Sequence, residues 1–191
     1  MANQCFDQKQ ESLEPEQEPS DKNELFHWIL TLAIAVIIAL CVNRFVLVNA
    51  EIPSGSMENT IMTHDRLIGF RFAYWFGEPK RFDIIIFRYP DDEKQLFIKR
   101  IIGLPGETVE IHDGQIFIDG SKTPLKDVTT KEFMQGSFGP YTVPDNCYFV
   151  MGDNRNNSKD SRYWKHTFVT DDEIVGKAFL RYWPLNKIKF L

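Results

Sequence analysis

Cysteine is scarce in this 191-residue chain, and its three copies lie in unlike surroundings. Cys5 belongs to an acidic N-terminal segment, Cys41 to an apolar run and Cys147 to a strand-like pattern. No two of them are placed as a disulfide framework or a zinc site requires. The chain is long enough to bury a core without either, and its cysteine usage leaves the redox compartment undetermined.

A surplus of positive charge is also missing. The formal net charge is −5, and residues 1–24 account for it with seven acidic and two basic side chains, which leaves 20 of each sign elsewhere. Without a basic excess, the folded part is poorly suited to a phosphate backbone, so we expect no nucleic-acid partner. Residues 1–24 are polar and rich in Glu, Pro and Gln, a composition that predicts a disordered tail.

One long apolar run stands out, over residues 25–42. As a helix its 18 residues would span roughly 27 Å, close to the ~30 Å hydrocarbon core of a bilayer, and the apolar residues up to 48 could extend it. We predict a single transmembrane anchor over residues 25–48. The alternative is a buried core helix, which is seldom so uniformly apolar.

A cleaved signal peptide is the closer alternative, because Val48-Asn49-Ala50 could serve as a small-residue cleavage site. The segment before the apolar run is long and acidic rather than short and basic, and the run exceeds the usual ~7–15 residues, so an uncleaved anchor is favoured. Lys22 before the run balances Arg44 after it. The positive-inside rule therefore leaves the orientation open.

After the anchor, short strand patterns replace helical ones. Asp113-Gly114 between residues 109–112 and 115–118 predicts a hairpin with a type I′ turn. Runs of β-branched and aromatic residues predict further strands at 83–89, 95–102, 147–151 and 174–183, with a looser insert at about 119–145. The predicted fold is mostly β, an antiparallel barrel or sandwich-like domain over residues 49–191.

The stretch Phe70 to Phe76 is unusually aromatic. It has two interpretations: an ordinary strand that packs its rings inward, or an apolar lip that docks into lipid headgroups, where Trp and Tyr are at home.

The usual partner of a catalytic serine, a suitably placed histidine, is not evident. His27, His64, His112 and His166 lack the spacing of a triad or a metal site, and no Gly-x-Ser-x-Gly elbow is present, which argues against an α/β-hydrolase. We expect no metal or cofactor. A nucleophilic serine would therefore need another base.

A buried lysine can be that base if burial brings its pKa down from about 10.4 toward neutrality. In the strand pattern around Lys99, Phe97 and Ile101 share its face. The ordinary alternative is a lysine that snorkels from a sheet edge. In Ser54-Gly55-Ser56, the glycine allows a tight turn that could aim an amide and a hydroxyl at one oxyanion, although such a turn is also common without function.

Three stretches, in order, resemble the motifs of type I signal peptidases. They are Ile52-Pro53-Ser54-Gly55-Ser56-Met57, the segment Ile98 to Gly106 (IKRIIGLPG), and the segment Gly152 to Arg162 (GDNRNNSKDSR). The resemblance implies a membrane-bound serine endopeptidase that removes signal peptides from preproteins after a small residue, through an acyl-enzyme. It also implies a single-pass protein of the plasma membrane, with a β domain outside the cytoplasm that lies on lipid.

By position, the resemblance implies a role for six residues. Ser56 would be the nucleophile and Lys99 the general base. The Ser54 hydroxyl and the Ser56 amide would hold the oxyanion, and Ser158 would orient the Lys99 amine. Asp160 and Arg162 would pair and hold their loop. The chain departs from the family pattern at Glu58 to Ile61, where a proline is usual, and at Glu107, where aspartate is commoner.

Two alternatives stay open. One is a membrane-tethered β domain that only binds, in which Lys99 is an ordinary charged residue. The other is a specialised relative that processes one substrate, such as a pilin.

Overall fold

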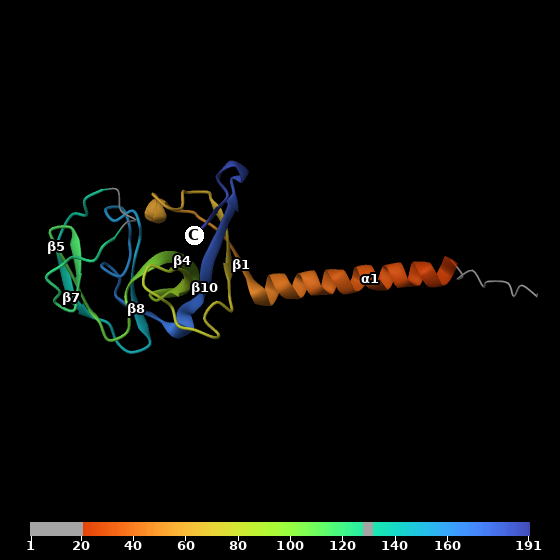
Figure 1. Ribbon diagram of the computed structural model, residues 1–191, viewed down its shortest axis with the longest axis horizontal. Helices are drawn as coiled ribbons and strands as arrows, with labels where there is room; N and C mark the ends of the chain where they lie inside the picture. The colour runs from red at the N-terminus through yellow and green to blue at the C-terminus, as the bar shows by residue number, and fades with distance from the viewer. Residues whose placement is uncertain (1–20, 128–131) are drawn as a thin grey trace, which may run out of the picture. The chain divides into compact units, whose positions relative to one another are not determined.

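The computed structural model describes residues 21–127 and 132–191, and side chains in the first helix from Asn23 onward (Figure 1). Most of the tail predicted at residues 1–24 therefore lies outside the described residues. The chain divides into two compact units, Met1–Leu40 and Cys41–Leu191.

The first unit contains helix α1 (Asp21–Cys41) except for its last residue. The span Asn23–Val46 contains an 18-residue window with a mean hydropathy of 2.6, and none of that window is buried within the protein. This exposure argues against a core helix and fits a membrane anchor. A π-helical turn, η1 (Val42–Val46), follows α1, and Leu47 and Val48 belong to a strand, so the helical part ends before the residue 48 expected from the sequence.

The second unit is a β domain, and all its described strand pairings are antiparallel, which confirms the predicted fold class. The strands are β1 (Leu47–Glu51), β2 (Arg66–Phe70), β3 (Ile84–Tyr89), β4 (Asp92–Gly103), β5 (Thr108–His112), β6 (Gln115–Ile118), β7 (Phe138–Thr142), β8 (Cys147–Met151), β9 (Val169–Thr170), β10 (Ile174–Trp183) and β11 (Lys189–Phe190). Three short 3₁₀ helices interrupt them, η2 (Gly55–Met57), η3 (Asp171–Glu173) and η4 (Leu185–Lys187).

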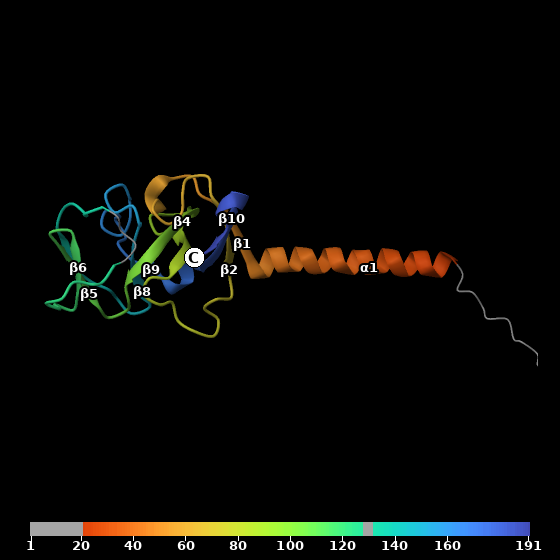
Figure 2. The ribbon, with the colours of Figure 1, turned by 45° about the horizontal axis from the view of Figure 1, so that its top comes forward.

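The strands form two sheets. The larger has the order β1-β2-β10-β3-β4-β8-β9, with β11 added beside β10, and the smaller has the order β6-β5-β7. Among the described pairings β1 does not join β9, so the large sheet stays open and the domain is sandwich-like rather than a closed barrel. In Figures 1 and 2, the small sheet lies next to the β8 end of the domain, whereas β1 lies at the other end.

The predicted hairpin is confirmed as β5 and β6. Asp113 and Gly114 have φ angles of 48° and 76°, the left-handed values that the turn requires. Across the hairpin, Val109 pairs with Ile118 and Ile111 pairs with Ile116. These side chains pack into the apolar cluster under the small sheet.

Strand β7 lies in the segment that the sequence places in a looser insert. Tyr141 and Thr142 pair with Val109 and Thr108 of β5. Gly139 and Pro140 interrupt the strand pattern in the sequence, since glycine weakens strands and proline cannot donate to a ladder. The pairing with β5 outweighs these local preferences.

The aromatic stretch does not form a strand with its rings turned inward. β2 ends at Phe70, and the following residues turn. The side chains of Trp75 and Phe76 are 71% and 95% exposed. Phe70 and Phe72 pack on each other, and Phe70 also packs on Phe179 of β10. An exposed aromatic edge therefore runs from this turn onto the sheet.

Candidate active site

Ser56 and Lys99 meet although 43 positions separate them in the chain. Ser56 lies in the short helix η2, and Lys99 lies in the middle of β4. The Lys99 Nζ atom is 2.7 Å from Ser56 Oγ and 3.2 Å from the carbonyl oxygen of Ile98. This is the distance of a direct hydrogen bond, close enough for a proton to move between the two groups.

Lys99 is buried, with 3% of its surface exposed. Its Nζ atom lies 5.4 Å from the centroid of the Phe97 ring. Burial lowers the pKa of Lys99 from 10.5 to about 8, against the opposing effect of the carboxylates of Asp160 and Asp153. Part of the Lys99 population is therefore neutral near pH 7, and a neutral amine can accept the Ser56 proton.

Ser54 lies on the exposed side of the same turn. Its Oγ atom is 3.4 Å from Ser56 Oγ. Between the two serines, a Cβ on Gly55 would come within 2.8 Å of the Glu58 carboxylate, so a side chain at this position would have to displace the end of the Glu58 side chain. The turn thus places two hydroxyls together at its open face.

The loop over residues 152–162, which we call the catalytic loop, holds the backbone of this turn. Asn154 donates through its backbone N–H to the carbonyl of Ser56 (3.1 Å) and through its side chain to the carbonyl of Gly55 (3.0 Å). A Cβ on Gly152 would stand 2.4 Å from the Ser56 carbonyl oxygen and 2.2 Å from Ser158 Oγ. Only glycine permits so close an approach.

Ser158 is buried beside Gly152, and its hydroxyl has no hydrogen-bond partner within the described part of the chain. The bond to Lys99 that the resemblance implies is thus not formed in this structure. A buried hydroxyl without a partner is energetically unfavourable, and such groups concentrate at functional sites. The orienting role of Ser158 remains a prediction.

Asp160 and Arg162 form a buried ion pair inside the catalytic loop. Arg162 donates from Nε and Nη2 to the two Asp160 oxygens at 2.8 and 2.9 Å. Asp160 also accepts the backbone N–H of Gly152 (3.0 Å). The pair fixes the loop next to the point where it touches the Ser56 turn.

A second buried ion pair lies next to Lys99, and the sequence does not predict it. Arg100 follows Lys99 on β4 and points away from it, where Nε and Nη2 donate to the two oxygens of Asp153 at 2.8 and 2.6 Å. Arg100 also donates to the carbonyl of Phe82 (2.7 Å). The available signal was an arginine on the same strand face as Ile98 and Ile102, because a buried charge needs a partner.

Ser56 and Lys99 line a cleft of about 620 Å³ between two strand edges. One wall comes from β1, including Asn49 and Ala50, and the other from β4, including Leu96 and Ile98. Among the described strands, β1 pairs only with β2, and β4 pairs with β8 only from Arg100 onward. Both walls therefore present unpaired backbone groups to the cleft, which suits an extended peptide.

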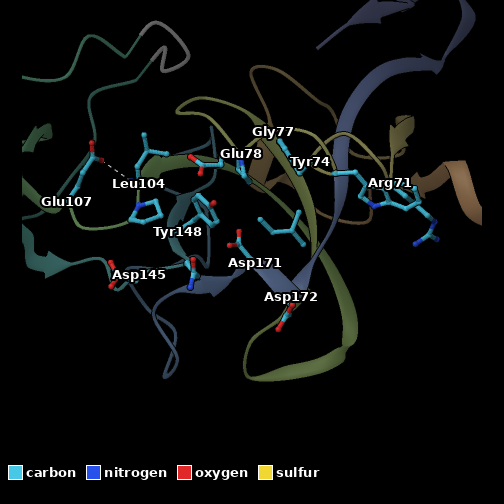
Figure 3. Close-up of a pocket in the computed structure, with 15 residues that line it drawn as sticks. Arg71, Tyr74, Gly77, Glu78, Leu104, Glu107, Asp145, Tyr148, Asp171 and Asp172 are labelled. Carbon is cyan, nitrogen blue, oxygen red and sulfur yellow. Dashed lines mark hydrogen bonds between the residues drawn. The ribbon is translucent and has the colours of Figure 1, made fainter.

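A second cleft, of about 1070 Å³, lies elsewhere on the domain (Figure 3). Its lining includes Tyr74, Glu78, Tyr148, Asp171 and Asp172. Neither Ser56 nor Lys99 lines it. Although this cleft is larger than the one at Ser56, it is therefore not the candidate active site.

The described residues contain no group of three or more His, Cys, Asp or Glu side chains that could hold a metal ion.

Comparison with known proteins places the chain in a family. The family model of signal peptidase, peptidase S26, matches residues 25–183, so the chain belongs to this family. Signal peptidase I of Leptolyngbya laminosa is 39% identical over 178 residues, covering 90% of this chain and 86% of that protein. Signal peptidase I of Bacillus licheniformis is 36% identical over 183 residues, covering 91% and 97%. A crystal structure of signal peptidase I from Enterococcus faecalis V583 is 37% identical and covers 52% of this chain and 96% of that chain, with a TM-score of 0.45.

Proposed function

We propose that this chain is a membrane-bound serine endopeptidase that removes signal peptides from preproteins by cutting after a small residue. The observation that carries the proposal is the 2.7 Å contact between Ser56 Oγ and the amine of the buried Lys99. Membership of the signal peptidase family supports the substrate class.

The mechanism that we propose is acyl transfer. The neutral Lys99 amine takes the proton of the Ser56 hydroxyl, and Ser56 Oγ attacks the carbonyl carbon of the scissile peptide bond. The resulting ammonium returns the proton to the leaving amine, which leaves an ester on Ser56. The same amine then removes a proton from water, and the hydroxide formed attacks the ester carbonyl carbon. As the ester bond breaks, the ammonium returns the proton to Ser56 Oγ, which frees the acid and restores the hydroxyl and the neutral amine.

The oxyanion that forms in each step needs hydrogen-bond donors. The Ser56 backbone N–H and the Ser54 hydroxyl lie on the same turn, and the 3.4 Å separation of the two hydroxyl oxygens places Ser54 beside the reacting atom. Donors fixed in advance where charge develops contribute strongly to catalysis. We assign them this role.

The substrate enters as an extended strand. The unpaired edges of β1 and β4 can bind its backbone on either side, and the apolar side chains between them leave shallow room for small residues. This fits a cut after small residues in the segment that follows a signal peptide's apolar core.

We further propose that α1 anchors the enzyme once in the plasma membrane, that the β domain lies on the extracytoplasmic side, and that Phe72, Trp75 and Phe76 contact lipid. The exposed rings suit the headgroup region. Preproteins emerge from this membrane, so a site near its surface would meet them there.

The deciding experiment is cleavage of a preprotein by the full chain in lipid vesicles. Wild type should release the mature protein, Ser56→Ala should not, and Ser137→Ala, at an exposed serine outside the site, should behave as wild type. Equal cleavage by Ser56→Ala would refute the mechanism. Absence of cleavage by a folded wild-type chain that still binds the preprotein would favour the binding module, and a panel of preproteins would reveal a specialised relative.

A further inference from the structure

The segment between β6 and β7 contacts the catalytic loop at several points. We call Asp127 and the described residues 132–135 the brace. Asn156 of the catalytic loop donates from Nδ2 to the carbonyl of Phe133 (3.0 Å) and accepts at Oδ1 from the N–H of Gln135 (2.9 Å). One side chain thus satisfies two backbone groups of the brace.

A buried ion pair makes the second connection. Arg155 Nη2 lies 2.6 Å from Asp127 Oδ2, and these side chains are only 2% and 10% exposed. Arg155 Nε donates to the carbonyl of Gly152 (2.9 Å). A buried guanidinium needs a counter-charge, so Asp127 keeps Arg155 in place behind Gly152.

Gly152 connects the Arg155–Asp127 ion pair to the backbone of Ser56. Its N–H is held by Asp160 and its carbonyl by Arg155, so neither end of the residue is free to turn. Its Cα faces the Ser56 carbonyl so closely that a Cβ would stand 2.4 Å from that oxygen. Asn154, next to Arg155 in the chain, bonds the carbonyls of Gly55 and Ser56.

We propose that the brace positions the catalytic loop, and that Asn156 and Asp127 are positioning residues for Ser56. Both act on Ser56 through the backbone of the catalytic loop. The inference rests on the proposed peptidase function. It gives the small sheet a role in catalysis, since this sheet contributes none of the reacting groups.

The first experiment measures kcat and KM of full-length Asn156→Ala on a preprotein. We expect kcat to fall about tenfold or more, because small displacements of reacting groups are costly, while KM stays within about twofold. KM should change less than kcat because most of the cleft lining comes from β1, the Ser56 turn and β4, and the catalytic loop contributes only Asn157 and Lys159. Asn156→Asp, which keeps the acceptor for Gln135 and loses the donor to Phe133, should retain an intermediate kcat.

Asp127→Asn should lower kcat in the same way, and Lys126→Ala, at the adjacent exposed residue, is the matched control. Melting temperatures identify variants that remain folded at the assay temperature. If folded Asn156→Ala and Asp127→Asn both keep the wild-type kcat, the proposal is overturned. An equal loss in Lys126→Ala would also overturn it.

A readout without turnover separates this inference from the proposed function. Amide hydrogen exchange in residues 152–158 should accelerate in Asn156→Ala while the β3 and β4 amides keep their protection. If amide hydrogen exchange in residues 152–158 is unchanged in Asn156→Ala, the proposal that the brace positions the loop is overturned, even if the wild type cleaves preproteins. Faster exchange would support it even if the wild type cleaves none.

Discussion

Arg100 and Asp153 are joined by two hydrogen bonds of 2.8 and 2.6 Å, one residue along β4 from the amine that faces Ser56. Asp160, the other acid near Lys99, is joined in the same way to Arg162. Each carboxylate that could stabilise a Lys99 ammonium is thus neutralised by an arginine. Lys99 therefore has burial without a counter-ion of its own, and this combination keeps its pKa low.

Activity should depend on pH through Lys99. With a pKa of about 8, the neutral amine is roughly a tenth of the population at pH 7 and most of it at pH 9. We expect kcat/KM to rise as pH increases and to level off above about pH 9. The measurement is a pH–rate profile on a preprotein whose cleavage does not depend on its own titration. A profile that still rises above pH 10 would indicate an ordinary lysine.

Lys99→Met should abolish cleavage and stabilise the β domain. The pKa difference between about 8 in the folded domain and 10.5 in an exposed lysine corresponds to about 3 kcal/mol against the ammonium. The unfolded chain binds more protons between these values, so wild-type stability rises with pH across that window. The advantage of Lys99→Met should be full below pH 8 and vanish above pH 10.5. Urea unfolding at pH 7 and pH 11 tests this.

Asp153→Asn should destabilise the domain by about 3–5 kcal/mol, because it leaves the buried Arg100 without its counter-charge. Glu51→Gln is the control, since it removes an exposed pair with Arg66 that is worth less than about 1 kcal/mol. Denaturant midpoints of the two variants give the comparison. If both variants lose a similar, small free energy of unfolding, the Arg100–Asp153 pair does not stabilise the fold.

Ser54→Ala should lower kcat by about 10²–10³ and leave KM nearly unchanged, as expected when one donor to an oxyanion is lost. Ser54→Thr keeps a hydroxyl and should retain much of the activity. A kcat within twofold of wild type in folded Ser54→Ala would remove Ser54 from the oxyanion site.

Replacing Phe72, Trp75 and Phe76 together by Ser should weaken binding of the domain without its anchor to liposomes. These rings are exposed, and burying them in a headgroup region is favourable. Phe133→Ser, at another exposed aromatic, is the control. Unchanged sedimentation of the triple variant with liposomes would exclude this surface as the lipid contact.

The sequence predicts the elements whose local signals agree with their packing. The hairpin at Asp113-Gly114 and the strands at residues 147–151 and 174–183 have strong turn or β-branched patterns, and the structure forms them at those positions. Strands β1 and β7 escape prediction because their partners, rather than their residues, decide their conformation.

The candidate site also has residues that the sequence predicts and residues that it does not. Ser56 and Lys99 are visible as motifs, whereas the pairing of Arg100 with Asp153 joins residues 53 positions apart. Nothing local in either segment encodes that pairing. Asn156 and Asp127 are likewise ordinary polar residues until the fold brings the brace against the catalytic loop.

Strand β1 contains Val48-Asn49-Ala50, small residues of the kind at which signal peptides are cut. In the folded domain Val48 is buried, and Asn49 and Ala50 are paired with Ile68 and Leu67 of β2. A peptidase requires its substrate as a free extended chain, so this segment would have to leave the sheet before it could be hydrolysed. Pairing with β2 thus keeps this segment out of the free extended form that a peptidase would bind.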